Sequence, residues 1–275
     1  MKSRGVADGA LAAFEARAAR AEALVDATPA AAEPLRFAAS LYRVQGALAT
    51  NAERLHGAQP LSGRLEADVD RLLAGLAELL DFASLHGPAG LAAEARSRSR
   101  DTRTVARDRL LAWWRGESSS AEDYVSRAFL RPYAEVLTRL GVRPDRGLEP
   151  GRCPTCGGLP WIAARRADSE ADGARRSLGC ALCGGEWTFS RIRCPGCGEE
   201  DAARLPSFRT ETHPAVRIEA CEACRRYVKS LDLTTDGRVV PEVDDLVSLS
   251  MDLWAGSQGF TRLEPGLAGS LPASA

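Results

Sequence analysis

The sequence predicts an α+β protein in which an N-terminal all-α helical domain precedes two small metal modules and a C-terminal helix. Two observations carry this prediction. The first 150 residues contain no cysteine and are rich in Ala, Leu, Arg and Glu, which are good helix formers. All eight cysteines then fall between Cys153 and Cys224, in a region rich in glycine and turn residues. At 275 residues the chain is long enough for more than one domain.

The N-terminal half has apolar residues at helical spacing, interrupted by proline and glycine. Leu11, Phe14 and Ala18 belong to the first such pattern, which Pro29 stops. Comparable patterns predict helices over residues 7–27, 31–56, 65–80 and 91–114. The polar centre of the last stretch leaves open a division into two helices. These patterns together predict a bundle of about five to seven helices.

A further helix is expected before the cysteine-rich region. Ser120 and Asp123, three positions apart, resemble a capping box at the start of this helix. Pro132 is expected to interrupt it, as the first residue of a new helical segment over residues 132–140. A turn-rich stretch, residues 143–151, then leads to the first cysteine.

The eight cysteines form four C-x-x-C pairs with a regular repeat. The pairs are Cys153/Cys156, Cys180/Cys183, Cys194/Cys197 and Cys221/Cys224. Adding 41 to each position of the first two pairs gives the positions of the last two, which indicates an internal duplication. Backbone N–H groups of a C-x-x-C knuckle point at the sulfurs, and two knuckles supply four thiolates in a tetrahedron around zinc or iron. All eight cysteines are therefore candidate metal ligands.

The repeat favours sequential pairing of the knuckles, although an interleaved cross-brace is also compatible with the spacing. In the sequential arrangement Cys153, Cys156, Cys180 and Cys183 hold one ion, and the last four cysteines hold another. A closed four-thiolate site has no open coordination position, which argues against Lewis-acid hydrolysis. Iron in such a site can pass one electron, whereas zinc is structural. The sequence thus predicts two metal ions and no catalytic residue.

Two other interpretations of the cysteines are weaker. A disulfide framework is disfavoured by the regular knuckle spacing, and nothing at the N-terminus reads as a signal peptide. A thiol–disulfide oxidoreductase would place one C-x-x-C at the start of a helix within a βαβ pattern, and no such unit surrounds these pairs. His213 lies near the knuckles and is interpreted as a surface residue, because the thiolates already fill both tetrahedra.

Short antiparallel strands are expected around the knuckles, followed by a C-terminal helix. The strands are predicted over residues 160–165, 186–192, 207–211, 216–219 and 227–233. Apolar residues from Val243 to Trp254 indicate the helix, and residues 264–275 are expected to form a frayed tail. The predicted domains are a helical domain over 1–145, metal modules over 146–193 and 194–240, and a helix with a flexible tail over 241–275.

The charges are balanced, with 36 Lys and Arg against 37 Asp and Glu. This balance gives no global electrostatic case for nucleic-acid binding. Three arginine pairs are interpreted as solvated faces that offset the thiolate charge: Arg165/Arg166, Arg175/Arg176 and Arg225/Arg226. No run of residues approaches the length needed to span a bilayer. We therefore expect a protein of the reducing cytoplasm, without membrane insertion.

Several segments around the knuckles carry a family resemblance: Cys153-Pro-Thr-Cys156-Gly157-Gly158, Arg176-Ser-Leu-Gly-Cys180-Ala-Leu-Cys183, Arg193-Cys194-Pro-Gly-Cys197-Gly198, Glu219-Ala-Cys221-Glu-Ala-Cys224 with Tyr227-Val-Lys229, and Asp244-Asp245-Leu246 through Asp252 to Gly259-Phe260. They resemble the FdhE family of formate dehydrogenase accessory proteins. In the helical half, the most similar stretch is Phe129-Leu130-Arg131-Pro132-Tyr133.

This resemblance implies a helical domain followed by two rubredoxin-like or zinc-ribbon-like modules. It favours rubredoxin-type iron at the two four-cysteine sites, with zinc as the alternative. It also implies a cytoplasmic accessory factor, not an enzyme, that binds the catalytic subunit of formate dehydrogenase during maturation, in the manner of a chaperone. The sequence does not identify the surface that binds the partner, and a groove between the helical domain and the metal modules is one candidate.

One alternative function belongs to a different class. A zinc-ribbon adaptor would bind nucleic acid or a transcription complex through a basic stripe with exposed aromatic residues, and its affinity would fall steeply with salt. The near-neutral charge balance argues against such an adaptor. The sequence leaves open whether an accessory role means protection, proofreading or electron transfer, and it leaves the oligomeric state open.

Overall fold

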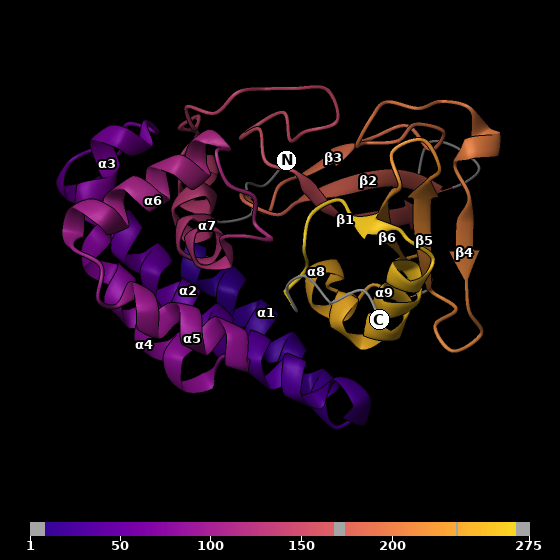
Figure 1. Ribbon diagram of the computed structural model, residues 1–275, viewed down its shortest axis with the longest axis horizontal. Coiled ribbons are helices and arrows are strands. Elements are labelled where there is room, and N and C mark those ends of the chain that lie inside the picture. Colours follow the sequence, from indigo (N-terminus) through magenta and orange to yellow (C-terminus); the bar gives the residue numbers. More distant parts are fainter. Residues whose placement is uncertain (1–8, 168–173, 235, 268–275) are drawn as a thin grey trace, which may run out of the picture.

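The computed structural model describes residues 9–167, 174–234 and 236–267 (Figure 1). Helices α1 to α7 lie on one side of the molecule and the β-sheet lies on the other, with the short C-terminal helices beside the sheet (Figure 1). This order confirms the predicted fold class, with an N-terminal helical part, a sheet part that holds the cysteines, and a C-terminal helix. Within the described residues, no helix combines the length and the apolar character that crossing a bilayer requires.

The helical half is built on two long helices: α1 (Ala10–Val25) and α2 (Ala32–Ala58). Helix α1 buries four residues whose spacing of three or four places them on one face: Ala10, Phe14, Ala18 and Ala21. Since three of these side chains are small, α2 can approach closely. At Gly46 of α2, an added Cβ would lie only 2.9 Å from Cδ1 of Leu11. Glycine at this position therefore permits the close packing of the two helices.

Five further helices follow in the described part of this half: α3 (Leu65–Leu72), α4 (Leu76–His86), α5 (Ala89–Arg98), α6 (Arg103–Arg115) and α7 (Tyr124–Arg139). A 3-10 turn at Leu73–Gly75 divides the stretch predicted as one helix over 65–80. The chain bends there with Gly75 against α2, where an added Cβ would lie 2.6 Å from Cδ2 of Leu48. The stretch over 91–114 is two helices, which settles a point that the sequence left open.

Helix α7 continues through Pro132, which corrects the predicted interruption at that residue. Pro132 has no N–H to donate to the carbonyl four residues earlier, at Ala128. Gln45 of α2 supplies the missing donor, because its Nε2 donates to the Ala128 oxygen at 2.9 Å. The helix also begins later than predicted. Asp123, and not Ser120, is the N-cap, and its carboxylate accepts a hydrogen bond of 2.8 Å from the first turn.

The sheet half has the strand order β3-β2-β1-β6-β5-β4, with β7 beside β6. Its strands are β1 (Pro160–Ala167), β2 (Ala174–Cys180), β3 (Glu186–Thr188), β4 (Ser207–Arg209), β5 (Val216–Cys221), β6 (Arg226–Asp232) and β7 (Thr261–Arg262). Strands β2 and β7 were absent from the prediction. β2 carries adjacent arginines where a strand pattern would alternate apolar and polar residues, and β7 has only two residues.

The duplication of the cysteine motif extends to the strands. A shift of 41 positions places β2 on β5 and places β3 within β6. Each repeat is a three-stranded antiparallel meander, and the two repeats join through β1 and β6. In an antiparallel meander the first and third strands run in the same direction. The first strand of one repeat, β1, therefore pairs in parallel with the third strand of the other repeat, β6. The two predicted modules therefore share one sheet, a feature that the sequence did not reveal.

The predicted C-terminal helix is confirmed, although a 3-10 turn divides it into two: α8 (Pro241–Asp244) and α9 (Leu249–Ser257). These helices pack around the fully buried Lys229 of β6. The Lys229 Nζ forms an ion pair of 3.0 Å with Asp245 and a second ion pair with Asp252. Arg262 donates two hydrogen bonds of 2.9 Å to Asp245. Two positive and two negative side chains therefore neutralise one another in the core.

A second ion-pair network joins the helical half to α8. Glu242 of α8 accepts hydrogen bonds from Arg17 of α1 and from Arg131 of α7. Glu135 completes the network, at 2.8 Å from Arg17 and 2.7 Å from Arg131. The Arg131 guanidinium also lies 5.0 Å from the centroid of the Trp161 ring in β1. Arg131, which belongs to the most family-like stretch of the helical half, therefore contacts both halves.

The segment after β7 is packed, as far as the structure describes it. Glu264 and Leu267 are each 6% exposed. Arg127 of α7 donates to Glu264 at 3.2 Å and to the Gly266 carbonyl at 3.0 Å. The hydroxyl of Tyr124 donates to the Leu267 carbonyl at 3.1 Å. The expected frayed tail is therefore wrong for residues 264–267, while residues 268–275 lie outside the described part of the chain.

Candidate metal centres

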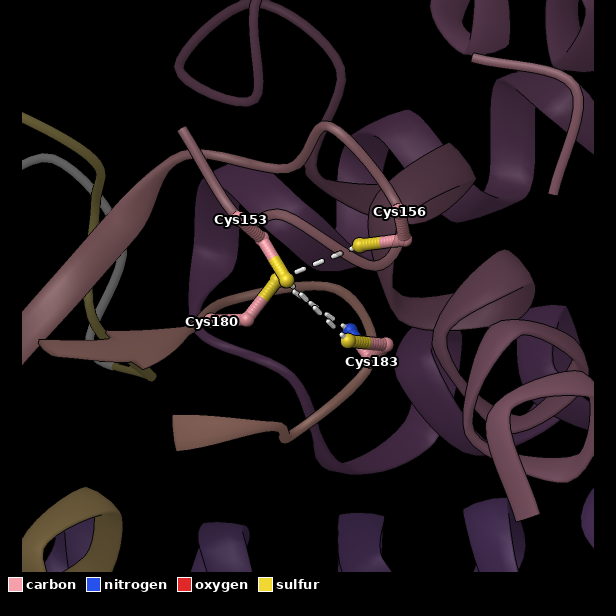
Figure 2. A group of neighbouring side chains, drawn as sticks. All are labelled: Cys153, Cys156, Cys180 and Cys183. Atoms are coloured by element: carbon pink, nitrogen blue, oxygen red, sulfur yellow. Dashed lines mark hydrogen bonds between the residues drawn. The ribbon is translucent and has the colours of Figure 1, made fainter. Parts of the chain in front are cut away.

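The structure gathers the eight cysteines into two groups of four. Cys153, Cys156, Cys180 and Cys183 form the first centre, and their side chains point toward one another (Figure 2). The second centre is formed by Cys194, Cys197, Cys221 and Cys224. In each centre all the Sγ atoms lie within 4.8 Å of one another. This is the sequential grouping of the knuckles, and it excludes the interleaved cross-brace.

The distances between the sulfurs suit a tetrahedral metal site. In the first centre, the Sγ atoms of Cys153 and Cys183 are 3.7 Å apart and those of Cys156 and Cys180 are 3.4 Å apart. The equivalent distances in the second centre are 3.8 and 3.6 Å. A tetrahedron with metal–sulfur bonds of about 2.3 Å has edges of about 3.8 Å. A disulfide bond would measure about 2.05 Å, so the donor set and its spacing fit zinc or iron.

The backbone of the first knuckle is the same in both repeats. The N–H of Cys153 donates to the Gly158 carbonyl at 2.9 Å, and the N–H of Gly157 donates to the Cys153 carbonyl at 2.9 Å. The equivalent bonds around Cys194 measure 2.8 and 3.0 Å. The N–H of Gly196 also donates to the Cys194 Sγ at 3.3 Å. Hydrogen bonds from a backbone N–H to sulfur favour the thiolate form of the cysteine.

Four turns of the knuckles require a left-handed backbone. Gly157 and Gly198 occupy equivalent positions in the two repeats, with φ of 69° and 81°. Gly184 has φ of 67°, and its equivalent 41 positions later is Arg225, with φ of 55°. Within the described chain, Arg225 is the one residue other than glycine with a positive φ. Its guanidinium lies 4.0 Å from the centroid of the Phe260 ring, a contact that offsets part of the backbone strain.

Alanine at the two equivalent glycines should have unequal effects. At Gly157 an added Cβ would lie 2.1 Å from the Gly147 carbonyl oxygen, so the linker before the first centre would have to shift. Gly157→Ala should therefore lower the free energy of unfolding by about 2–5 kcal/mol and speed metal release. At Gly198 the nearest atom would be 3.7 Å away, so Gly198→Ala should cost only the backbone strain, about 1–2 kcal/mol. Denaturant unfolding and the rate of metal transfer to a chelator measure both effects, and equal losses would contradict this interpretation.

The two centres differ in exposure. All four cysteines of the first centre are buried and belong to the same hydrophobic cluster as the helices. The helical half covers this centre closely, because an added Cβ at Gly184 would lie 3.1 Å from Arg17 and 3.2 Å from Glu135. In the second centre Cys197 is exposed and Cys224 is half-buried. Solvent or a partner protein therefore reaches the second centre more readily than the first.

The electrostatic environment of the sulfurs also favours a bound cation. Burial raises the pKa of the Cys180 thiol and the pKa of the Cys194 thiol. Four adjacent thiolates without a cation would repel one another, and burial would oppose their charge. A metal ion among them reverses this preference, because its positive charge stabilises deprotonated sulfur. The residues of both centres therefore fit a resident metal ion.

Other polar residues near the knuckles lie outside both centres. His213 Nε2 is 3.3 Å from the Ser250 hydroxyl and belongs to neither group of sulfurs. Glu186 forms an ion pair of 2.8 Å with Arg166. Among the residues that the structure describes, His, Cys, Asp and Glu side chains form no third group with the spacing to hold an ion.

One arginine that was expected on a solvated face is buried. Arg176 of β2 is 5% exposed and forms an ion pair of 2.7 Å with Glu219 of β5. Its Nη1 donates to the Ser190 carbonyl at 2.8 Å. The two residues of the ion pair are 43 positions apart in the sequence, so no local pattern could reveal their contact.

The fold and the two sites define a class of protein, with a helical half and a duplicated sheet half that carries two four-cysteine centres able to hold metal ions. Comparison with known proteins shows which proteins this chain resembles. Residues 192–267 match the family model described as "FdhE, C-terminal domain". A Protein FdhE homolog from Pseudomonas putida is 29% identical over 279 residues, a match that covers 92% of this chain and 86% of that protein.

Two further comparisons also show similarity to FdhE proteins. A Protein FdhE homolog from Aquifex aeolicus is 35% identical over 117 residues, which are 42% of this chain and less than half, 41%, of that protein. The crystal structure of the FdhE protein from Pseudomonas aeruginosa shares the fold, with a TM-score of 0.67 at 24% identity, over 94% of this chain and 95% of that chain. The predicted resemblance to the FdhE family is therefore confirmed.

Proposed function

We propose that this protein is an accessory factor in the formation of active formate dehydrogenase and that it binds the catalytic subunit during maturation. The observation that carries this proposal is the similarity to a Protein FdhE homolog along 92% of the chain. The two four-cysteine centres, which the family resemblance leads one to expect, add to it. In this role the protein acts in the cytoplasm in the manner of a chaperone and is not itself an enzyme.

The eight cysteines are the ligands of two metal ions in this proposal, with one ion in each centre. The sulfur distances of 3.4 to 3.8 Å support it. Rubredoxin-type iron is favoured by the family resemblance and would supply one-electron chemistry, whereas zinc would be structural. A helical domain over residues 1–145, metal modules over 146–193 and 194–240, and a C-terminal unit over 241–275 belong to the same proposal.

A cleft between the two halves is the proposed binding surface for the catalytic subunit. Its volume is about 730 Å³, and it is bordered by the loop over residues 116–122 and by the segment over residues 261–266. Leu182, next to the first centre, and Arg226, close to the second centre, both line it. Its lining includes several arginines and the aromatic residues Trp113, Tyr227 and Phe260, and both residue types are enriched at protein–protein interfaces. A polypeptide in this cleft would contact residues beside both centres.

Affinity capture from cells that express formate dehydrogenase tests this proposal. The tagged protein, captured without oxygen, should retain the catalytic subunit, identified by mass spectrometry. Gly256→Trp should abolish retention, because Gly256 lines the cleft and an added Cβ there would have no atom within 4 Å, so the new ring would extend into the cleft. Gly90→Trp is the matched control, since Gly90 also lies in a helix with open space but is not part of the cleft lining.

The outcomes separate the accessory role from the other functions. Loss of retention when Cys194 and Cys197 are both replaced by alanine would place the second centre at or near the interface. Capture of nucleic acid or transcription proteins in place of the catalytic subunit would contradict the proposal and support the adaptor function. Equal retention by the Gly256 and Gly90 variants would exclude the cleft as the binding surface.

A further inference from the structure

A small pocket of about 150 Å³ lies among the strands next to the second centre, with Cys194 and Cys221 in its lining. Arginines supply most of its charge: Arg165, Arg176, Arg191, Arg193, Arg217 and Arg226. Glu219 is the sole acidic residue in the lining as the structure describes it. The lining residues therefore carry an excess of five positive charges, in a protein whose overall formal charge is −1.

The pocket belongs to the face of the sheet that α9 does not cover. Lys229 of β6 points to α9, where it binds Asp252. Ser230, the next residue of β6, points to the opposite face, and Arg217 of β5 is its register partner. Arg165 pairs in register with Asp232, two positions beyond Ser230, and therefore lies on the same face as Arg217. The sheet itself thus directs arginines from neighbouring strands toward one place.

This concentration of charge opposes the stability of the sheet. Arg165 and Arg176 are direct register partners in the β1–β2 pair. Arg209 and Arg217 are direct register partners in the β4–β5 pair. Like charges in directly opposite positions destabilise a strand pair. An anion bound beside Arg165, Arg176 and Arg217 would relieve part of this repulsion.

Carboxylates of the protein offset part of this charge, since Arg165 lies 3.8 Å from Asp232 and Arg193 lies 3.5 Å from Glu200. Glu219 is committed to Arg176, whose Nε and Nη2 donate to one carboxylate oxygen at 2.8 and 2.7 Å. The other carboxylate oxygen is 3.9 Å from Arg217. A divalent ion with four thiolates at the second centre would add a charge of minus two. With these three carboxylates and the second centre set against the six lining arginines, an excess of one positive charge remains.

We propose that this pocket binds one phosphate group, either of inorganic phosphate or of a small phosphate ester. The planar guanidinium group matches the oxygens of phosphate with paired hydrogen bonds, and several arginines converge here. The small, concave volume suits a single phosphate group better than the repeated phosphates of a nucleic acid. This site is independent of the proposed role in formate dehydrogenase maturation.

Calorimetric titration of the metal-loaded full chain tests the site. Sodium phosphate and phenyl phosphate should each bind saturably, above a sodium chloride reference of matched ionic strength. Arg217→Gln should weaken binding by roughly tenfold or more, because one charged hydrogen-bond donor is lost. Glu219→Gln should tighten binding several-fold, because the competing carboxylate is removed while an oxygen remains to accept from Arg176.

Arg209→Gln is the matched control. This variant also removes the Arg209–Arg217 repulsion, but Arg209 itself lies outside the lining of the pocket. It should leave phosphate binding unchanged, while circular dichroism and metal content confirm that each variant folds. Tighter binding of phenyl phosphate than of inorganic phosphate would assign the site to phosphate esters, and the reverse would assign it to the free ion. Equal weakening in the Arg209 and Arg217 variants, or no binding above chloride, would overturn the proposal. Tight binding of a short oligothymidylate that Arg217→Gln abolishes would instead assign the surface to nucleic acid.

Discussion

Cys153→Ala should empty the first centre, so that the chain retains one metal equivalent in place of two. Three thiolates cannot complete the tetrahedron, and a small module loses much of its folding free energy with its ion. Because this centre belongs to the main hydrophobic cluster, the helical half should also lose stability while it keeps most of its helical signal. Metal analysis per chain, circular dichroism and denaturant unfolding measure these effects.

Cys194→Ala is the matched variant at the equivalent position of the second repeat. It should also release one metal equivalent, but with a smaller loss of stability in the helical half, because the cysteines of the second centre lie outside the main cluster. If Cys153→Ala emptied both centres, the two repeats would fold as a single unit through the shared β1–β6 pair. Full retention of metal by either variant would contradict the assignment of these cysteines as ligands.

Glu242→Gln should lower the free energy of unfolding by about 3–5 kcal/mol, because it leaves two buried guanidinium groups with the single carboxylate of Glu135 between them. Burial by itself would raise the pKa of Glu242, but the charges of Arg131 and Arg17 outweigh it and lower this pKa to about 2. A depressed pKa stabilises the folded protein at a pH above the usual carboxyl pKa of about 4.3. This contribution is lost as the pH falls toward 2.

Denaturant unfolding across the acid range checks this prediction. The wild-type protein should lose stability steeply below a pH of about 4, and the Glu242 variant should lose less over the same range. Glu22→Gln is the control, since Glu22 forms an exposed ion pair of 2.7 Å with Arg43. Such a surface pair contributes about 0–1 kcal/mol. A loss of this small size in the Glu242 variant would show that its network does not hold the two halves together.

The helices could be predicted from the sequence because their apolar residues repeat locally. Pro132 could not be placed correctly by local rules, because the residue that makes it tolerable within α7, Gln45, lies in another helix. Strand β2 was missed for a related reason. Its arginines are stabilised by contacts outside the strand, such as that of Arg176 with Glu219, and so they break the usual alternation.

The candidate centres could be predicted more completely than the fold around them. Spacing alone identified all eight cysteines and favoured the sequential grouping that the structure contains. The contacts that pack the C-terminal segments against the sheet and the helices could not be predicted, because they join residues far apart in the sequence. Lys229 is fully buried only because Asp245 and Asp252 return to it from the C-terminal helices. The packed course of residues 264–267 likewise depends on Arg127 in α7.

X-ray absorption spectroscopy combined with metal analysis of the purified chain tests the central claim most directly. Two ions per chain are expected, each with four sulfur neighbours at about 2.3 Å and with no nitrogen or oxygen in the coordination shell. The energy of the absorption edge would also distinguish iron from zinc. Fewer than two ions per chain, or a shell that includes lighter donors, would contradict the assignment of two closed four-thiolate centres.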